Sequence, residues 1–271
     1  MKSHNIMEKK VRLAGEIVFQ TSFHIGSGRE GEMSTDMGVL REPGSGRPVL
    51  PGSSLKGIFR STAEKLAVHL GMTACFLDMS LSNIQCVTDE EFRRGHYDGF
   101  KKLVTEKDKL KWLDNKICDV CRLFGSPLHG SRIFFSDGLL KYWSGATEIR
   151  DGVCLDRDSE TARPNMKFDY EVVPSMSSFE VQIDVENPDD QELALIGAVL
   201  AEWQQSFKIG GKTSRGLGLA VFKSVQVDAV DFSDMEQLSS YLLHKKMTSE
   251  PDLLQQALKT VLQNKGGQAH A

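Results

Sequence analysis

HIGSGREGEMSTDMG, residues 24–38, and PGSSLKGIFR, residues 51–60, form the stretch of this sequence that decides its fold. The stretch begins where an alternating apolar strand ends and finishes inside an amphipathic helix, so a long polar loop joins the first strand to the first helix. Loops anchored on a rigid edge often carry function. Pro51 and the residues after it predict free backbone N–H groups at a positive helix end, with Lys56 and Arg60 one turn apart on one face. This arrangement suits a phosphate backbone.

Length, composition and charge set the class of protein. With 271 residues and 40% hydrophobic content, the chain can bury a substantial core as a single domain, 1–271, with insertions. Residues 1–10 contain no apolar signal core, and no run approaches the roughly 20 apolar residues that cross a bilayer, so we expect a soluble cytoplasmic protein. Because the formal net charge is −4, any nucleic-acid binding has to rely on a local basic track.

Hydrophobic periodicity outlines six core elements. Period-two alternation predicts strands, and stripes of period 3.6 predict helices. The predicted elements are a strand at 11–19, a helix at 54–70, a strand at 131–140, a strand at 179–185, a helix from 189 to 207 and a strand at 217–227. Ser53 or Ser54 is the expected cap of the first helix. The order predicts an α+β fold with the βαββαβ core of ferredoxin-like and RNA-recognition folds.

Three segments interrupt or extend this core. Residues 72–122 mix charge clusters with four of the five cysteines and predict an insertion. Residues 145–175 predict a protruding arm, because they hold many charges and turn residues but little apolar periodicity. Residues 231–271 predict a C-terminal helical extension, with a helix at 251–262 that has Pro251 near its start. The apolar face of this helix is expected to cover the core.

The cysteines predict a structural zinc site. Five cysteines cannot pair completely, and CDVC at 118–121 offers two thiolates from one tight turn. Two more thiolates from a distant loop would complete a closed tetrahedral site that staples the polar insertion. The predicted ligands are Cys75, Cys86, Cys118 and Cys121. The alternative is a set of ordinary thiols, and His69 and His96 compete with Cys86 for the fourth position. Cys154 stands apart in the arm and receives no role.

GGKTSRGLG at 210–218 contains Gly-Lys-Thr, but it does not predict the phosphate loop of an NTPase. That loop needs a glycine at 206, where this chain has Ser206, and it needs a strand before it and a helix after it. Here a helix precedes and a strand follows. The segment instead predicts a turn whose backbone approaches a ligand closely, with Lys212 and Arg215 available for phosphates. A plain helix-to-strand turn is the alternative.

Asp36 is the catalytic candidate. It lies in a polar loop without an adjacent Lys or Arg to neutralise its charge. A carboxylate close to a ribose 2′-hydroxyl can take its proton and let that oxygen attack the neighbouring phosphate. Most loop aspartates are simply solvated or cap a turn, so this chemistry alone leaves both interpretations open.

Six sequence blocks together resemble one family. They are HIGSG at 24–28; Asp36 with VLREP at 39–43; PGSSLKG at 51–57 with Arg60; CRLFG at 121–125; LDR at 155–157 with Thr161, Ala162 and EVVP at 171–174; and GGKTSRGLG at 210–218. In this order, through residues of about 11–222, they resemble the backbone subunit of type III CRISPR effector complexes, which is part of the RAMP superfamily. The cysteine set resembles the zinc-bearing variants of that subunit.

The resemblance implies a modified RNA-recognition fold whose copies polymerise along a CRISPR RNA, together with other type III effector subunits. The arm would be a thumb that distorts the guide–target duplex. Asp36 falls at the position of the aspartate that cuts target RNA by metal-dependent 2′-hydroxyl attack, with Mg²⁺ or Mn²⁺. By position, the implied RNA-binding residues are His24, Lys56, Arg60, Asp156, Arg157, Lys212 and Arg215. Base pairing by the guide would supply the specificity.

Two other functions remain open at this point. A purely structural RNA-binding subunit follows if Asp36 is misplaced relative to the thumb. A CRISPR-RNA processing enzyme is the third possibility, since some relatives cut the precursor with histidines. His24 has no evident partner histidine nearby in the sequence.

Overall fold

Strand β1 (Lys9–Phe19) is central in the larger of the two β-sheets of this computed structural model, which describes residues 5–26, 36–77 and 84–268. The large sheet has the strand order β2-β6-β1-β8-β7, with β3 paired to β6 and β9 paired to β8. Its other strands are β2 (Ile133–Phe135), β3 (Leu139–Tyr142), β6 (Ser178–Glu186), β7 (Phe207–Lys208), β8 (Leu219–Asp231) and β9 (Thr248–Ser249). The pairs in this sheet are antiparallel.

The core begins at β1, which pairs with a long strand on each side. Leu13 of β1 lies opposite Ile183 of β6 and Val227 of β8, and all three side chains are buried. Because side chains alternate along a strand, this register places one apolar face of the sheet against the helices. The predicted mixture of helices and antiparallel sheet is confirmed.

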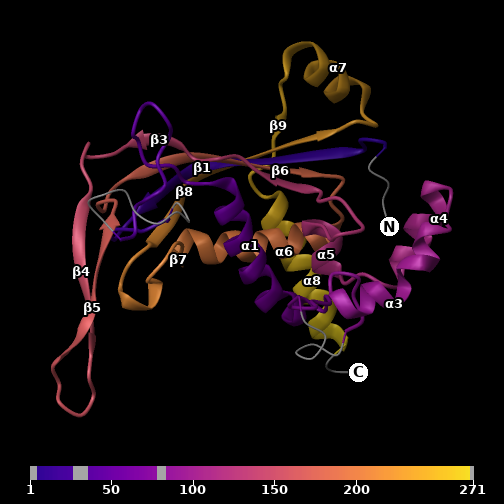
Figure 1. Cartoon of the computed structure of the whole chain (residues 1–271). Helices are drawn as coiled ribbons and strands as arrows, with labels where there is room; N and C mark the ends of the chain where they lie inside the picture. Colours follow the sequence, from indigo (N-terminus) through magenta and orange to yellow (C-terminus); the bar gives the residue numbers. More distant parts are fainter. Residues whose placement is uncertain (1–4, 27–35, 78–83, 269–271) are drawn as a thin grey trace.

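Helices cover that face of the sheet (Figure 1). The two central helices are α1 (Gly52–Ala67), which continues into a 3-10 turn at Val68–Leu70, and α6 (Asp190–Gln205). Phe59 of α1 and Trp203 of α6 are fully buried, with ring centroids 5.1 Å apart, so aromatic packing joins the two helices. Helix α8 (Leu253–Gln268) packs on α6 and buries Leu254, and it extends beyond the predicted end at 262.

The start of α1 differs from the prediction. Pro51 is the N-cap, and neither predicted serine caps the helix. Instead, the Asp137 carboxylate accepts a hydrogen bond of 2.6 Å from the Gly52 N–H. A Cβ on Gly52 would lie 2.5 Å from the Phe135 carbonyl oxygen, so this end of the helix presses against the chain that follows β2. The helix N-terminus is therefore not fully free for an external phosphate, because a carboxylate distant in sequence already binds it.

The single strand predicted at 131–140 is two strands, β2 and β3. The chain bends between them, where the Gly138 N–H donates to the Leu50 carbonyl at 2.8 Å. A Cβ on Gly138 would lie 3.0 Å from the Leu50 and Phe179 side chains, so only glycine fits this approach without a shift. Periodicity could not reveal the break, since it depends on the loop before α1.

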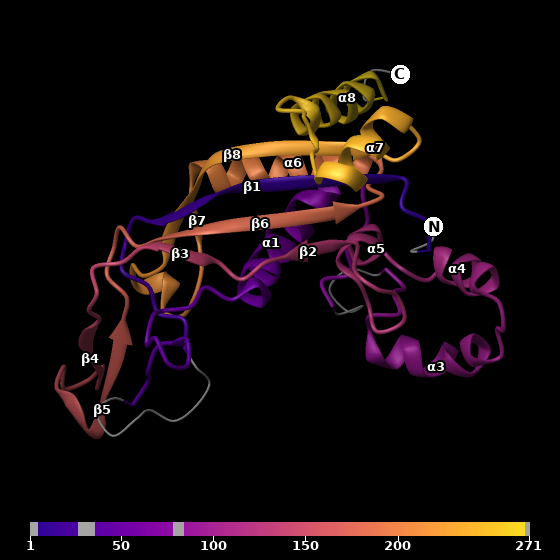
Figure 2. The same ribbon diagram turned by 90° about the horizontal axis from the view of Figure 1, so that it is seen from above.

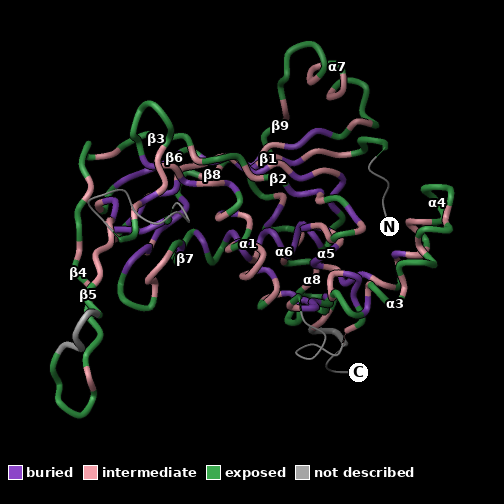
Figure 3. The backbone as a smooth tube through the Cα atoms, in the orientation of Figure 1, coloured by how far each residue is buried: buried purple, intermediate pink, exposed green. Residues whose placement is uncertain are grey.

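Two outlying structures lie at opposite ends of the sheet (Figure 2). At one end, β4 (Glu148–Leu155) and β5 (Ala162–Val172) form a separate two-stranded sheet that projects as an arm. At the other end lie α3 (Glu90–Lys101) and α4 (Glu106–Asp114). The next helix, α5 (Asp119–Phe124), contacts α1. Helix α7 (Met235–His244) follows β8. Burial concentrates in the sheet and central helices, and much of the arm is exposed (Figure 3). No described helix is long and apolar enough to span a bilayer.

Candidate functional site

Asp36 lies against the arm base, which we define as residues 168–171 of β5. Its side chain is exposed, and Oδ2 accepts a hydrogen bond of 2.9 Å from the Asp169 backbone N–H. The next residue, Met37, pairs with Tyr170, and its carbonyl accepts the Glu171 N–H at 2.9 Å. The arm base therefore holds the predicted catalytic carboxylate at the edge of the main body. Residues 27–35, the middle of the predicted loop, lie outside the described residues.

Glu171 fixes the segment that follows Asp36. Its Oε2 accepts a hydrogen bond from the Val39 N–H at 2.9 Å, and its Oε1 accepts one from the Thr147 hydroxyl at 2.5 Å. Oε1 also forms an ion pair with Arg41. Burial tends to raise the pKa of Glu171, but the hydrogen bonds from Thr147, Val39 and Arg41 outweigh it and hold the pKa below its ordinary value of 4.5. An ionised Glu171 thus connects the arm base, the loop and β4.

His24 joins the glycine-rich turn to the same arm base. Its Nδ1 donates to the Glu171 carbonyl oxygen at 2.7 Å, and its own carbonyl oxygen accepts the Gly211 N–H at 2.7 Å. Gly210 has φ +95°, and a Cβ there would lie 2.4 Å from the His24 oxygen. The predicted close backbone approach is present, but it is an approach to His24 within the protein.

Lys212 reaches from the glycine-rich turn to the arm. Its Nζ lies 4.6 Å from the Phe168 ring centroid and 4.5 Å from the Tyr170 ring centroid, within cation–π range. Arg215 ends the 3-10 turn Thr213–Arg215 and is exposed. The structure therefore gathers Asp36, His24 and Lys212 around β5. Arg215 is an exposed cation close to Lys212 in the chain.

The other predicted RNA-binding residues lie elsewhere. Lys56 donates from Nζ to Ser131 Oγ at 2.7 Å, and burial lowers its pKa. Arg60 is mostly buried and faces the α5 turn. Asp156 organises the tip of the arm, where its Oδ1 accepts the Ser159 N–H at 3.1 Å, and Arg157 is exposed beside it. The predicted set thus divides among the arm base, α1 and the arm tip.

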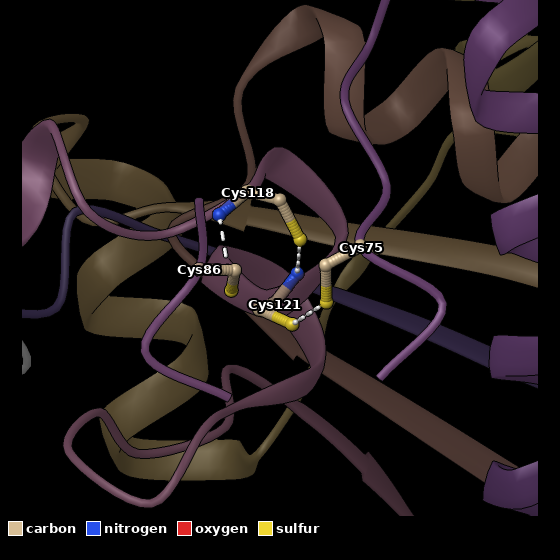
Figure 4. A group of neighbouring side chains, drawn as sticks. All are labelled: Cys75, Cys86, Cys118 and Cys121. Atoms are coloured by element: carbon tan, nitrogen blue, oxygen red, sulfur yellow. Dashed lines mark hydrogen bonds between the residues drawn. The ribbon is translucent and has the colours of Figure 1, made fainter. Parts of the chain in front are cut away.

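The four predicted cysteine ligands come together (Figure 4). Cys75, Cys86, Cys118 and Cys121 are all buried, and their sulfur atoms lie within 4.8 Å of one another. Among the described residues, neither His69 nor His96 belongs to this group, and His96 Nδ1 donates to the Phe92 carbonyl oxygen at 2.9 Å. Cys154 is exposed in the arm.

Local hydrogen bonds explain how distant segments meet at the cluster. Cys118 is the N-cap of α5, and its sulfur accepts the Cys121 N–H at 3.4 Å. Thr73 donates to the Asp119 carboxylate from its N–H and its hydroxyl, both at 2.7 Å, and so ties the segment of Cys75 to α5. The Cys86 sulfur accepts the Cys118 N–H at 3.5 Å. The chain thus holds four sulfurs around one point without any disulfide.

The chemistry of this donor set fits zinc. Hydrogen bonds from Cys118 and Cys121 hold the pKa of the Cys86 thiol below its ordinary value, and hydrogen bonds with Cys121 and Cys75 raise the pKa of the Cys118 thiol. Four buried thiols at this separation cannot all ionise alone, because their charges repel one another in a poorly solvated site. A divalent cation removes that conflict, and four thiolates in tetrahedral arrangement are a typical structural zinc site.

Sequence reasoning missed several residues that build these sites. Glu171 belongs to the EVVP block at 171–174, and sequence reasoning gave it no role, although it anchors the loop after Asp36. Phe168 and Tyr170 alternate on β5, a pattern of aromatics that could have indicated a cation site. Thr88 donates to Cys121 Sγ at 3.1 Å, and nothing in its local sequence signals this.

Comparison with known proteins finds one family and several relatives. The model of the RAMP superfamily matches residues 16–222. The CRISPR system Cms endoribonuclease Csm3 of Methanothermobacter thermautotrophicus is 24% identical over 252 residues, covering 81% of this chain and 86% of that protein. The protein of the same name from Streptococcus thermophilus is 23% identical over 239 residues, covering 82% and 90%. That from Enterococcus italicus is 44% identical over 68 residues, covering only 24% and 30%.

Proposed function

The chain belongs to the RAMP superfamily, and from this premise we propose that it is a backbone subunit of a type III CRISPR ribonucleoprotein that cleaves target RNA. Two relatives that cover at least 81% of the chain carry the name endoribonuclease Csm3. The strand order β8-β1-β6-β2, with helices in the two crossovers, supports a ferredoxin-like core. Within it, 72–122 is the zinc-binding insertion, 145–175 the thumb and 231–271 a helical extension.

In this proposal, copies of the chain line a CRISPR RNA in the cytoplasm, in company with other type III effector subunits. The guide pairs with the target RNA, and the protein engages the backbone and shape of the duplex. The proposed RNA-binding set is the one the sequence predicts: His24, Lys56, Arg60, Asp156, Arg157, Lys212 and Arg215. Lys212 supplies partly exposed positive charge at the arm base, and the exposed Arg215 follows it in the same turn.

The observation that carries the enzymatic proposal is the attachment of Asp36 to the arm base. An exposed carboxylate there can take the proton of a ribose 2′-hydroxyl on a strand bent over the thumb. The 2′-oxygen then attacks the adjacent phosphorus, the bond from phosphorus to the 5′-oxygen breaks, and that oxygen takes a proton from water, after which Asp36 returns its own proton to solvent. The products are a 2′,3′-cyclic phosphate and a 5′-hydroxyl. Glu171 of β5 holds the loop after Asp36, and Lys212 places positive charge over Tyr170 of the same β-strand.

Two kinds of metal ion belong to the proposal. Zn²⁺ would be held by Cys75, Cys86, Cys118 and Cys121 and would be structural, since the four sulfurs are buried and leave no open position for a substrate. Mg²⁺ or Mn²⁺ would supply charge stabilisation for the phosphate during cleavage. Asp36 is the acidic residue proposed at that step.

The test is cleavage by the assembled complex with Asp36→Ala. Guide and target binding should survive, while cutting at the regular sites should fall by at least about 10²-fold, the lower range for loss of a general base. Asp98→Ala, an exposed aspartate of α3 at the far end of the sheet, is the matched control and should cut normally.

Persistent cutting by the Asp36→Ala complex would refute the catalytic role. Wild-type complex that binds target but shows no metal-stimulated cutting would instead support a structural RNA-binding subunit. Cutting of precursor RNA by the isolated chain without metal would support the processing enzyme, although Nδ1 of His24 is already hydrogen-bonded to Glu171.

A further inference from the structure

Arg60 lies where α1 meets the cysteine cluster. Its Nη2 donates to Cys121 Sγ at 3.1 Å, and its Nη1 approaches the Gly125 carbonyl oxygen at 3.5 Å. Its Nε donates to Glu64 Oε1 at 2.9 Å, and the Arg60 and Glu64 side chains are only 19% and 12% exposed. The guanidinium is therefore committed to three partners within the protein, and one of them is a predicted metal ligand.

Cys121 Sγ accepts a second hydrogen bond, from Thr88 Oγ1 at 3.1 Å. Four thiolates around one divalent cation carry a net charge of −2. Donors to the sulfurs, above all a cationic one, offset this charge and orient the ligand. Arg60 is suited to this task because its guanidinium stays charged even when it is mostly buried.

A second hydrogen bond joins α1 to the same region. Lys56, one turn before Arg60, donates to Ser131 Oγ at 2.7 Å, and the next residue, Arg132, donates from its backbone N–H to the Leu123 carbonyl oxygen of α5 at 2.9 Å. The face of α1 that carries both cations therefore rests on the segment that begins with the CDVC turn. These hydrogen bonds connect that turn to α1.

We propose that Arg60 is a positioning residue of the zinc centre, which holds Cys121 and couples metal binding to the position of α1. The inference rests on the proposed function, because it takes the four cysteines as a zinc site and α1 as part of the RNA-binding surface. Arg60 then acts on RNA through the metal centre. Zinc binding orders the α5 turn, Arg60 transmits that order to α1, and Lys56 is held in place.

The experiment measures zinc release from the purified full-length chain. Arg60→Gln, Arg60→Lys and wild type are loaded with zinc, and release to a chelator is followed with a metallochromic dye. Lys65→Gln is the matched control, because it removes a cation from the same helix at a cavity between α1 and α6. A parallel set loaded with Co²⁺ reports the thiolate-to-cobalt charge-transfer band, which depends on hydrogen bonding to sulfur.

We expect Arg60→Gln to weaken zinc binding about 10-fold or more, as for loss of other supporting partners of metal ligands, and to release zinc correspondingly faster. Its cobalt band should shift. Arg60→Lys keeps the charge but loses the planar fork, so an intermediate effect is expected, and it serves as the test variant if Arg60→Gln does not fold. Lys65→Gln should match wild type in both measurements.

The outcomes separate this inference from the proposed function. A wild-type chain with well under one zinc per molecule would refute the metal centre and the inference together. One zinc per chain, with unchanged release and cobalt spectra in both Arg60 variants, would overturn the inference alone. If guide-RNA affinity, measured on the same variants, falls in Arg60→Gln while zinc release stays normal, Arg60 contacts RNA directly, as a member of the RNA-binding set, and the positioning role is overturned.

Discussion

Glu171, a half-buried carboxylate, organises the segment that follows Asp36. It accepts hydrogen bonds from the Val39 N–H, the Thr147 hydroxyl and the Arg41 guanidinium. Its backbone carbonyl also accepts His24 Nδ1. The segment that carries Asp36 is therefore tied to the arm through Glu171, and the charge of Glu171 is what makes these bonds strong.

The first prediction concerns the pH dependence of stability. The folded-state pKa of Glu171 lies below its ordinary value of 4.5, so its ionised form stabilises the fold above that pH. This stabilisation should disappear as the pH falls through the lowered pKa. Glu171→Gln should therefore lower the free energy of unfolding at pH 7 by about 1.5–3 kcal/mol, typical of hydrogen bonds to a charged group, and by less as the pH falls below 4.5.

Urea unfolding of both proteins across this pH range measures the gap. Glu148→Gln is the control on the neighbouring strand, since its side chain is 55% exposed and pairs with Arg150. An equal gap at pH 7 and pH 3 would contradict the assignment. Target cleavage by the Glu171→Gln complex should also fall, because the loop of Asp36 loses its anchor.

At the scale of secondary structure, a buried ion pair joins β2 to α6. Arg132 of the chain just before β2 pairs with Glu192 in the first turn of α6, and both side chains are at most 6% exposed. Arg132 Nη1 also donates to the Asn187 carbonyl oxygen at 2.7 Å. Burial raises the pKa of Glu192 despite the attraction of Arg132, so the ionised carboxylate depends on its partner.

The second prediction tests this pair. Arg132→Met should lower the free energy of unfolding at pH 7 by about 3–5 kcal/mol, because it leaves a buried carboxylate without a partner. The double variant Arg132→Met with Glu192→Leu should recover most of that loss. Since a raised folded-state pKa costs stability as the pH rises, Arg132→Met should also be less destabilised at pH 5 than at pH 7.

Denaturant unfolding of the single and double variants at both pH values provides the measurement. Arg94→Met is a matched control, because Arg94 forms an exposed ion pair with Glu90 in α3. That substitution should change the stability by less than about 1 kcal/mol. A double variant as unstable as Arg132→Met alone would show that the loss comes from packing and from the other hydrogen bonds of the pair, and not from the unpaired charge.

At the scale of the whole molecule, the arm stands apart from the core. Strands β4 and β5 pair with each other in a sheet of their own, and contact with the main body is concentrated at the arm base (Figures 1 and 2). Stability and the proposed RNA chemistry should therefore be separable. The core contacts the arm base, whereas in the proposed function the projecting tip acts on the guide–target duplex.

The third prediction shortens the arm. Residues 154–166 are replaced by Asn-Gly, which closes a two-residue hairpin between the paired Val153 and Lys167. The unfolding midpoint and zinc content should stay close to those of wild type, while target cleavage by the assembled complex should be lost. Calorimetry, elemental analysis and a cleavage assay make the comparison. A second variant keeps the native arm length but has a Gly-Ser tip. Cleavage by this variant would show that arm length is sufficient, and loss of cleavage would show that Asp156 and Arg157 are needed.

Much of this architecture was accessible from sequence because it depends on local periodicity. The alternation around β1, β6 and β8 and the stripes of α1 and α6 arise from residues close together in the chain. Six ordered blocks also identified the family, which the match over residues 16–222 establishes. The break between β2 and β3 and the cap of α1 by Asp137 were not accessible, since each depends on a partner far away in the chain.

The sequence by itself determined the class of fold, the family and the identity of four cysteines able to share a metal ion, because residue type and order carry that information. Only the tertiary structure decided that Cys86 and neither histidine completes the cluster, that Arg60 faces a sulfur, and that Asp36 rests on the arm base. The physical reason is that hydrogen bonds between distant segments depend on how strands and helices pack, and periodicity does not encode that packing.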